Sequence, residues 1–137
     1  MRIISGTHKG RKINPPKNLP IRPTTDRAKE ALFSIIDNRY YFEEKNMLDL
    51  FCGSGNISFE FASRGVEKVT SVDNNKNCID FIDKTAEQMQ LNISTIKTDG
   101  LVLFLTFLKA EMSDSKECPF LICIQFQLND LNFFDKS

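Results

Sequence analysis

The sequence has few of the residues that build metal sites or disulfide frameworks. It contains one histidine and four cysteines, and no two cysteines form a C-x-x-C pair. This composition argues against a zinc site and favours reduced thiols. No apolar run approaches the length that crosses a bilayer, and no signal-peptide core follows the basic start. We therefore expect a soluble cytoplasmic protein with no metal and no membrane partner.

The chain also lacks net charge at neutral pH, but its charges are distributed unevenly. Residues 1–30 carry eight lysines and arginines against two acidic residues, whereas the rest carries ten basic and sixteen acidic residues. A basic end on an acidic body is typical of a surface that meets a polyanion. A solvated lysine-rich terminus has the same composition, so charge alone leaves both interpretations open.

The order of the apolar segments predicts an α/β fold. At 137 residues the chain has the size of one domain and is short for a complete α/β enzyme. Helical spacing and strand-length runs alternate, which favours about four parallel strands with helices on both faces. The predicted strands are Met47–Phe51, Val66–Asp73, Ile93–Thr98 and Phe120–Phe126, and the predicted helices cover about 26–37, 56–64, 74–90 and 101–109.

A separate element precedes this sheet. Residues 1–20 predict a small basic β-hairpin, in which Arg2–Ser5 pairs with Arg11–Ile13, followed by a proline-rich connector. The remaining residues, 21–137, form the main domain in this division.

The strongest chemical signal is the stretch LDLFCGSGNIS, residues 48–58. A strand runs into a G-x-G turn at Gly53 and Gly55, where the absence of a side chain allows a ligand to approach the backbone. Asp49, just before the turn, can receive a cationic or amine group. The third glycine of the dinucleotide fingerprint is absent, which argues against a pyrophosphate-binding enzyme. A tight turn between strand and helix is the simpler alternative.

Two further acidic residues end the following strands. Asp73 ends the second strand, where a carboxylate can accept hydrogen bonds from both ribose hydroxyls of a nucleotide. Asp99 follows the third strand and can accept from an adenine amino group. Each aspartate is also a good helix N-cap, and this alternative stays open for both.

Taken together, these segments resemble the bacterial small-subunit ribosomal RNA methyltransferases that methylate N2 of a guanine. The resemblance runs from Met1 to about Leu105 and is lost after about Thr106. It rests on the basic start MRIISGTHKGRKI, the stretch RPTTDRAKEALFSII, the glycine loop, SVD and TDGLVLFL. The glycine loop is shared by many methyltransferases, whereas RPTTDR together with the basic start is more specific.

The resemblance implies a Rossmann-like methyltransferase sheet that binds S-adenosyl-L-methionine, with 16S ribosomal RNA in an assembling 30S particle as partner and a monomeric state. The implied cofactor-binding residues are Asp49, Phe51, Gly53, Gly55, Asp73 and Asp99, with Arg22, Thr24 and Thr25 over the methionine end. The implied RNA-binding residues are Arg2, Lys9, Arg11 and Lys12, which would contact phosphates.

The sequence departs from the family at the expected catalytic motif. The family places Asp or Asn, two prolines and an aromatic residue after its fourth strand, where Ile124, Gln125 and Phe126 stand here. The catalytic residues are therefore unidentified, and the early end at Ser137 suggests a shortened or frame-shifted chain. We expect a guanine-N2 methyltransferase; one alternative is a cofactor- and RNA-binding remnant without turnover. A second is a small-molecule methyltransferase or another nucleotide-cofactor enzyme.

Overall fold

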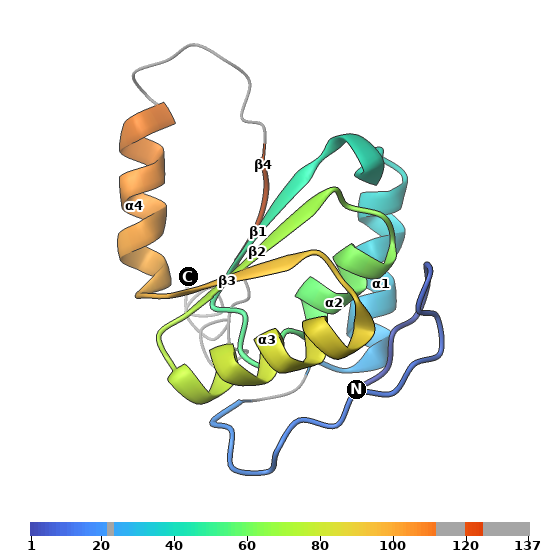
Figure 1. Cartoon of the computed structure of the whole chain (residues 1–137). Coiled ribbons are helices and arrows are strands. Elements are labelled where there is room, and N and C mark those ends of the chain that lie inside the picture. The colour runs from blue at the N-terminus through green and yellow to red at the C-terminus, as the bar shows by residue number, and fades with distance from the viewer. Residues whose placement is uncertain (22–23, 112–119, 125–137) are drawn as a thin grey trace, which may run out of the picture.

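The computed structural model describes residues 1–21, 24–111 and 120–124, and shows an open parallel sheet (Figure 1). Four strands pair in the order β3-β2-β1-β4, and every pairing is parallel. This confirms the predicted α/β, Rossmann-like sheet of about four strands. The strands are β1 (Asn46–Leu50), β2 (Lys68–Asp73), β3 (Ile93–Lys97) and β4 (Phe120–Ile124).

Helices cover both faces of this sheet, as predicted. Figure 1 shows α4 on one side of the strands and the other three α-helices on the opposite side. Met47 and Val69 pack in the cluster that includes residues of α1 and α2, whereas Leu50 and Val72 pack against residues of α4. The helices are α1 (Asp26–Asp37), α2 (Asn56–Ser63), α3 (Lys76–Met89) and α4 (Gly100–Glu111), with a short 3₁₀ helix, η1 (Phe42–Glu44), that was not predicted.

Local capping explains where the helices begin. The Thr25 side chain accepts a hydrogen bond from the Ala28 N–H at 3.1 Å, which confirms the predicted start of α1. Helix α3 begins at Lys76, later than the predicted Asn74, because the Asn75 side chain accepts hydrogen bonds from the Asn77 and Cys78 N–H groups.

The predicted N-terminal β-hairpin is only partly correct. Arg2 and Lys12 form a single antiparallel bridge, and no longer strand runs through the segment. Backbone hydrogen bonds also join Met1 to Ile13 in both directions, and Ile3 to Gly10 and Arg11. The Ile4 and Ser5 N–H groups donate instead to the carboxylate of Glu60 on α2. The two arms therefore pair over residues 1–3 and 10–13, and the pairing ends where the Glu60 side chain takes up the backbone donors.

Within the described ranges, no helix is both long and apolar enough to span a membrane.

Candidate cofactor site and nucleic-acid surface

The glycine loop lies at the carboxyl ends of β1 and β2. Gly53 and Gly55 have φ values of 56° and 81°, in the left-handed region that favours glycine. A Cβ on Gly55 would lie 2.9 Å from Ile82 and 3.0 Å from the ring of Phe59, so no side chain fits there. Close packing of α2 and α3 under the loop explains the second glycine, while the surface above Gly53 is partly exposed.

Asp73 ties this loop to the end of β2. Its Oδ2 atom accepts a hydrogen bond from the Gly53 N–H at 2.9 Å, and its Oδ1 atom accepts one from the Asn75 N–H at 2.9 Å. The helix-cap interpretation of Asp73 is wrong, because Asn75 caps α3. The side chain lies partly exposed beside the glycine turn, so its predicted contact with a ribose stays a prediction that the geometry allows.

Asp99 has the role that its alternative interpretation predicted. Its Oδ1 atom accepts a hydrogen bond from the Leu101 N–H at 2.8 Å at the start of α4. The side chain is exposed, at the carboxyl end of β3. Its carboxylate oxygens can accept further hydrogen bonds, so the predicted contact with an adenine amino group stays a prediction that the geometry allows.

Asp49 is fully buried directly beneath the glycine loop. Its Oδ2 atom accepts a hydrogen bond from Ser58 Oγ at 2.5 Å, and Ser71 Oγ donates to Ser58 Oγ at 2.6 Å. Its Oδ1 atom is the single buried side-chain nitrogen or oxygen without a hydrogen-bond partner among the described residues. Burial, and to a lesser extent the negative charge of Asp73, raises the pKa of Asp49 to about 7.

This arrangement fits a ligand that carries a positive charge. A buried carboxylate oxygen without a partner is costly, and a nearby cation relieves the cost by stabilising the ionised form. S-adenosyl-L-methionine offers an ammonium group and a sulfonium centre. The donor and acceptor set at Asp49, Asp73 and the glycine loop therefore suits that cofactor.

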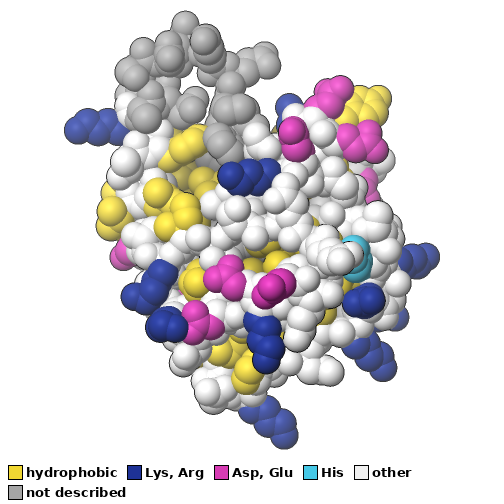
Figure 2. Space-filling model, viewed as in Figure 1, with side chains coloured by type: hydrophobic (Ala, Val, Ile, Leu, Met, Phe, Trp, Pro, Cys, Tyr) yellow, Lys and Arg dark blue, Asp and Glu magenta, His cyan; other side chains and the backbone are white. Residues whose placement is uncertain are grey.

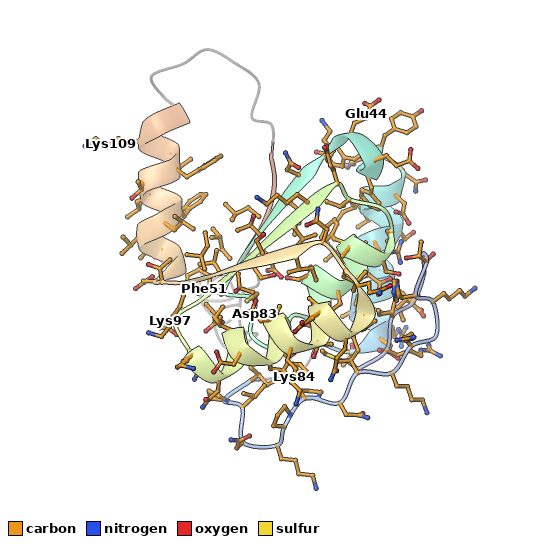
Figure 3. All side chains as sticks on the ribbon, viewed as in Figure 1. Glu44, Phe51, Asp83, Lys84, Lys97 and Lys109 are labelled. Carbon is orange, nitrogen blue, oxygen red and sulfur yellow. The ribbon has the colours of Figure 1, made fainter. Side chains whose placement is uncertain are left out.

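Phe51 lies at the edge of the same site in a strained conformation. Its φ is 60°, which is uncommon for a residue with a side chain and is often found at functional sites. Phe51 is 42% exposed, and in Figure 3 it lies beside the start of α4. Its ring atoms lie 3.1–3.3 Å from where a Cβ on Gly100 would stand. Sequence reasoning missed Gly100, although a glycine directly after a strand-ending aspartate was an available signal.

The segment before α1 lies against the glycine loop. A Cβ on Gly53 would stand 3.2 Å from the side chain of Ile21, and the Thr24 carbonyl accepts a hydrogen bond from Asn56 Nδ2 at 3.1 Å. Thr25 caps α1. Arg22 lies outside the described residues, so its role at the methionine end stays a prediction.

The expected catalytic position lies at the same edge of the sheet. Ile124 is the last residue of β4 and pairs in register with Leu50, directly before the glycine loop. Gln125 and Phe126 lie outside the described residues. Within the part of the chain that the structure describes, no group of three or more side chains is placed to hold a metal ion.

The basic side chains of the N-terminal segment are exposed. Lys9, Arg11 and Lys12 all face solvent, whereas Arg2 lies 3.5 Å from Asp26 in an ion pair. Figure 2 shows several Lys and Arg side chains around the single histidine, which belongs to this segment. The predicted RNA-facing residues therefore lie on an accessible surface, with Arg2 partly neutralised by its partner.

Comparison with known proteins identifies the family. A family model described as "Conserved hypothetical protein 95" matches residues 1–114. The chain belongs to that family. Ribosomal RNA small subunit methyltransferase D of Haemophilus influenzae is 39% identical over 98 residues, which cover 71% of this chain and 46% of the relative.

Solved structures of the same kind agree with the fold. The Escherichia coli protein yhhF matches with a TM-score of 0.66 and 29% identity, over 75% of this chain and 55% of that one. A hypothetical protein of Thermus thermophilus matches with a TM-score of 0.68 and 25% identity, over 82% of this chain and 63% of that one. The chain spans about half the length of the curated relatives it matches.

Proposed function

We propose that this chain carries the cofactor-binding half of an S-adenosyl-L-methionine-dependent methyltransferase that acts on N2 of a guanine in 16S ribosomal RNA. The observation that carries the proposal is the pairing of Asp73 with the glycine turn above the buried, half-satisfied carboxylate of Asp49. Family membership and the name of the Haemophilus influenzae relative support ribosomal RNA as the substrate class.

In this proposal each part of the site has a separate task. When bound, the cofactor supplies an electrophilic methyl group on its sulfonium. Asp73 accepts hydrogen bonds from the ribose, and Asp49 faces the positive charge of the methionine portion. Phe51 and Asp99 flank the adenine. Binding and orientation, which lower the entropic cost of bringing the reactants together, are therefore the main contributions of these residues.

The N-terminal residues 1–20 form the nucleic-acid surface in the same proposal, and residues 21–137 form the methyltransferase domain. Lys9, Arg11 and Lys12 contact phosphates, which gives affinity and register without selecting a sequence. The partner is 16S ribosomal RNA, within an assembling 30S particle.

Calorimetry with S-adenosylhomocysteine tests the cofactor half of the proposal. The wild-type chain is expected to bind, and Asp73→Ala is expected to bind about 5- to 100-fold more weakly, because charge-assisted hydrogen bonds are lost. Asp80→Ala removes an exposed carboxylate that pairs with Lys76 on α3 and is the matched control. Absence of heat on folded wild-type protein would contradict the proposal. Binding of NADH instead would favour another nucleotide-cofactor enzyme.

A further inference from the structure

A fully buried carboxylate holds the N-terminal segment on the main domain. Glu60 of α2 accepts hydrogen bonds from the backbone N–H groups of Ile4, at 2.9 Å, and Ser5, at 3.0 Å. Arg64 Nε donates to the same carboxylate at 3.0 Å, and the Glu60 side chain is 0% exposed. The position of the basic segment is therefore set by a charge inside the domain.

Lys29 of α1 joins this carboxylate to a second group. Its ammonium group, 1% exposed, donates to the Arg2 carbonyl, to Asn56 Oδ1 at 2.9 Å and to Glu60 Oε2 at 3.0 Å. An ammonium group has three N–H bonds, so its donors match these three acceptors in number. Removing any one acceptor would leave a buried donor unpaired.

Asn56 continues the network to the segment before α1. Its side-chain oxygen accepts from Lys29, so its Nδ2 atom is oriented to donate to the Thr24 carbonyl at 3.1 Å. Asn56 directly follows Gly55, and it is 3% exposed. Asn56 is therefore covalently next to the glycine loop. It also bonds to Thr24 directly and connects to the N-terminal segment through Lys29.

We propose that Lys29, Asn56 and Glu60 are positioning residues that link the nucleic-acid surface to the cofactor site, so that each ligand strengthens binding of the other. The inference rests on the proposed function, because it assigns RNA to the N-terminal segment and cofactor to the loop. Restraint of residues 2–5 by a bound RNA is carried through Glu60, Lys29 and Asn56 to Thr24. The second ligand then meets a Thr24 carbonyl whose position is already restrained, which lowers the cost of its binding.

Asn56→Asp cuts this link at one point. The substituted side chain still offers Lys29 an acceptor, but it replaces the N–H donor by an oxygen that repels the Thr24 carbonyl. The N-terminal segment stays attached, because Glu60 and the Ser63 hydroxyl, which accepts from the His8 N–H, are unchanged. Asn38→Asp is the matched control, since Asn38 Nδ2 also donates to a carbonyl, that of Ser34, at the opposite end of α1.

The experiment measures S-adenosylhomocysteine affinity by calorimetry with and without saturating 16S ribosomal RNA. For the wild type, RNA is expected to tighten binding by about fivefold or more. For Asn56→Asp this ratio is expected to fall to about one, with affinity in the absence of RNA about three- to tenfold weaker. Asn38→Asp is expected to retain the wild-type ratio.

The outcomes separate the inference from the proposed function. A wild type that binds neither ligand overturns the proposed function and the link together. A wild type that binds both ligands, but binds S-adenosylhomocysteine equally well with and without RNA, overturns the link alone. An Asn56→Asp variant in which RNA tightens S-adenosylhomocysteine binding as much as in the wild type also overturns the link alone. If circular dichroism shows that Asn56→Asp does not fold, Asn56→Ser replaces it, because the shorter side chain removes the amide donor without adding charge. Lys29 loses one acceptor in this variant but keeps the Arg2 carbonyl and Glu60.

Discussion

Asp49 shows how much a single residue at this site depends on its surroundings. It is the only acid within β1, and its two oxygens have different environments, one bonded to Ser58 and one without a partner among the described residues. Such a group stores unfavourable free energy in the unliganded protein. A ligand with a positive charge relieves it.

The raised pKa of Asp49 makes stability fall with pH in the unliganded protein. Because burial raises the pKa from 3.8 to about 7, the folded state binds a proton that the unfolded state has released over this range. The stabilisation of the folded state by protonated Asp49 is fully present below about pH 4 and is lost as the pH rises through about 7. Asp49→Asn keeps the shape and the Ser58 contact without the ionisation. Its melting temperature is therefore expected to exceed that of the wild type increasingly between about pH 4 and 7, and by a constant amount above that range.

Thermal melts at several pH values check this expectation. Asp83→Asn is the control, because Asp83 also accepts a hydrogen bond from a hydroxyl, Thr95 Oγ1, but on the exposed surface. If the melting temperatures of the wild type and Asp49→Asn change with pH in parallel, Asp49 is not the group that makes stability fall with pH. In the proposed function the same variant binds S-adenosylhomocysteine more weakly, so its stability and its affinity change in opposite directions.

Gly100 offers a second test that separates stability from binding. Its Cα faces the ring of Phe51 so closely that an added methyl group would displace the ring by a few tenths of an ångström. Its φ lies outside the left-handed region, and alanine is the better helix former by up to about 1 kcal/mol. Gly100→Ala is therefore expected to melt no lower than about the wild-type temperature but to bind S-adenosylhomocysteine several-fold more weakly.

Differential scanning fluorimetry and calorimetry on the same samples measure both effects. Thr106→Ala is the control, because Thr106 is an exposed residue on the same helix whose hydroxyl donates a hydrogen bond to the Val102 carbonyl. Unchanged affinity in Gly100→Ala would mean that the position of Phe51 does not affect the cofactor site.

At the scale of elements, the N-terminal segment is expected to determine the salt dependence of RNA binding. Lys9, Arg11 and Lys12 are exposed, and each phosphate they neutralise releases counterions. Replacing all three by alanine is expected to weaken RNA binding and to reduce the slope of log K against log salt by up to about 2–3. S-adenosylhomocysteine affinity without RNA should stay near the wild-type value.

Filter binding at several salt concentrations provides the measurement. Alanine at Lys84, Lys97 and Lys109, which are exposed on α3, β3 and α4, removes the same charge from three other elements (Figure 3). If both triple variants flatten the slope equally, RNA does not prefer the N-terminal segment.

The elements that the sequence predicted are those with strong local signals. Helix α1 has a capping threonine and a periodic apolar face. Strand β1 is a short, mostly apolar run before the glycine loop, and strands β2 and β3 end at the polar residues Asp73 and Lys97. The glycine turn was recognised because its spacing reflects a local backbone requirement. The order β3-β2-β1-β4 was not predicted, because it depends on pairing between segments that are far apart in the sequence.

What the sequence did not predict depends on long-range partners. Glu60 and Lys29 are charged residues on helices, which are ordinarily exposed, yet each is 1% exposed or less because each has several partners from other segments. No local pattern identifies partners that lie 27 to 56 residues away in the sequence. The same contacts explain why backbone pairing in the N-terminal segment ends at Ile3 instead of continuing to Ser5.

At the scale of the whole molecule, binding and turnover depend on different parts of the sheet. The glycine loop, Asp49 and Asp73 belong to β1 and β2, in the middle of the described sheet. The position expected to hold the acceptor base is the end of β4, at Ile124, next to β1. A chain can therefore retain cofactor binding and lack the residue that holds the acceptor base.

The last prediction follows from this division. A guanine amino group is a poor nucleophile, and an enzyme must hold it and remove its proton as the new bond forms. Ile124 offers no side-chain acceptor, and loss of one such transition-state contact costs about 10²–10³ in rate. We expect the 137-residue chain to methylate 16S ribosomal RNA at least ~100-fold more slowly than the Haemophilus influenzae relative. Single-turnover transfer of a tritiated methyl group measures this rate.

A chimera tests the reason for the slow rate. Residues 1–123 of this chain, followed by the corresponding carboxyl-terminal part of the Haemophilus influenzae relative, keep the cofactor loop and replace Ile124 and everything after it. Recovery of methyl transfer would show that the first four strands and their loop are competent. If the 137-residue chain itself transfers the methyl group at the relative's rate, Ile124 does not mark a missing contact. Some other residue of this chain must then hold the base.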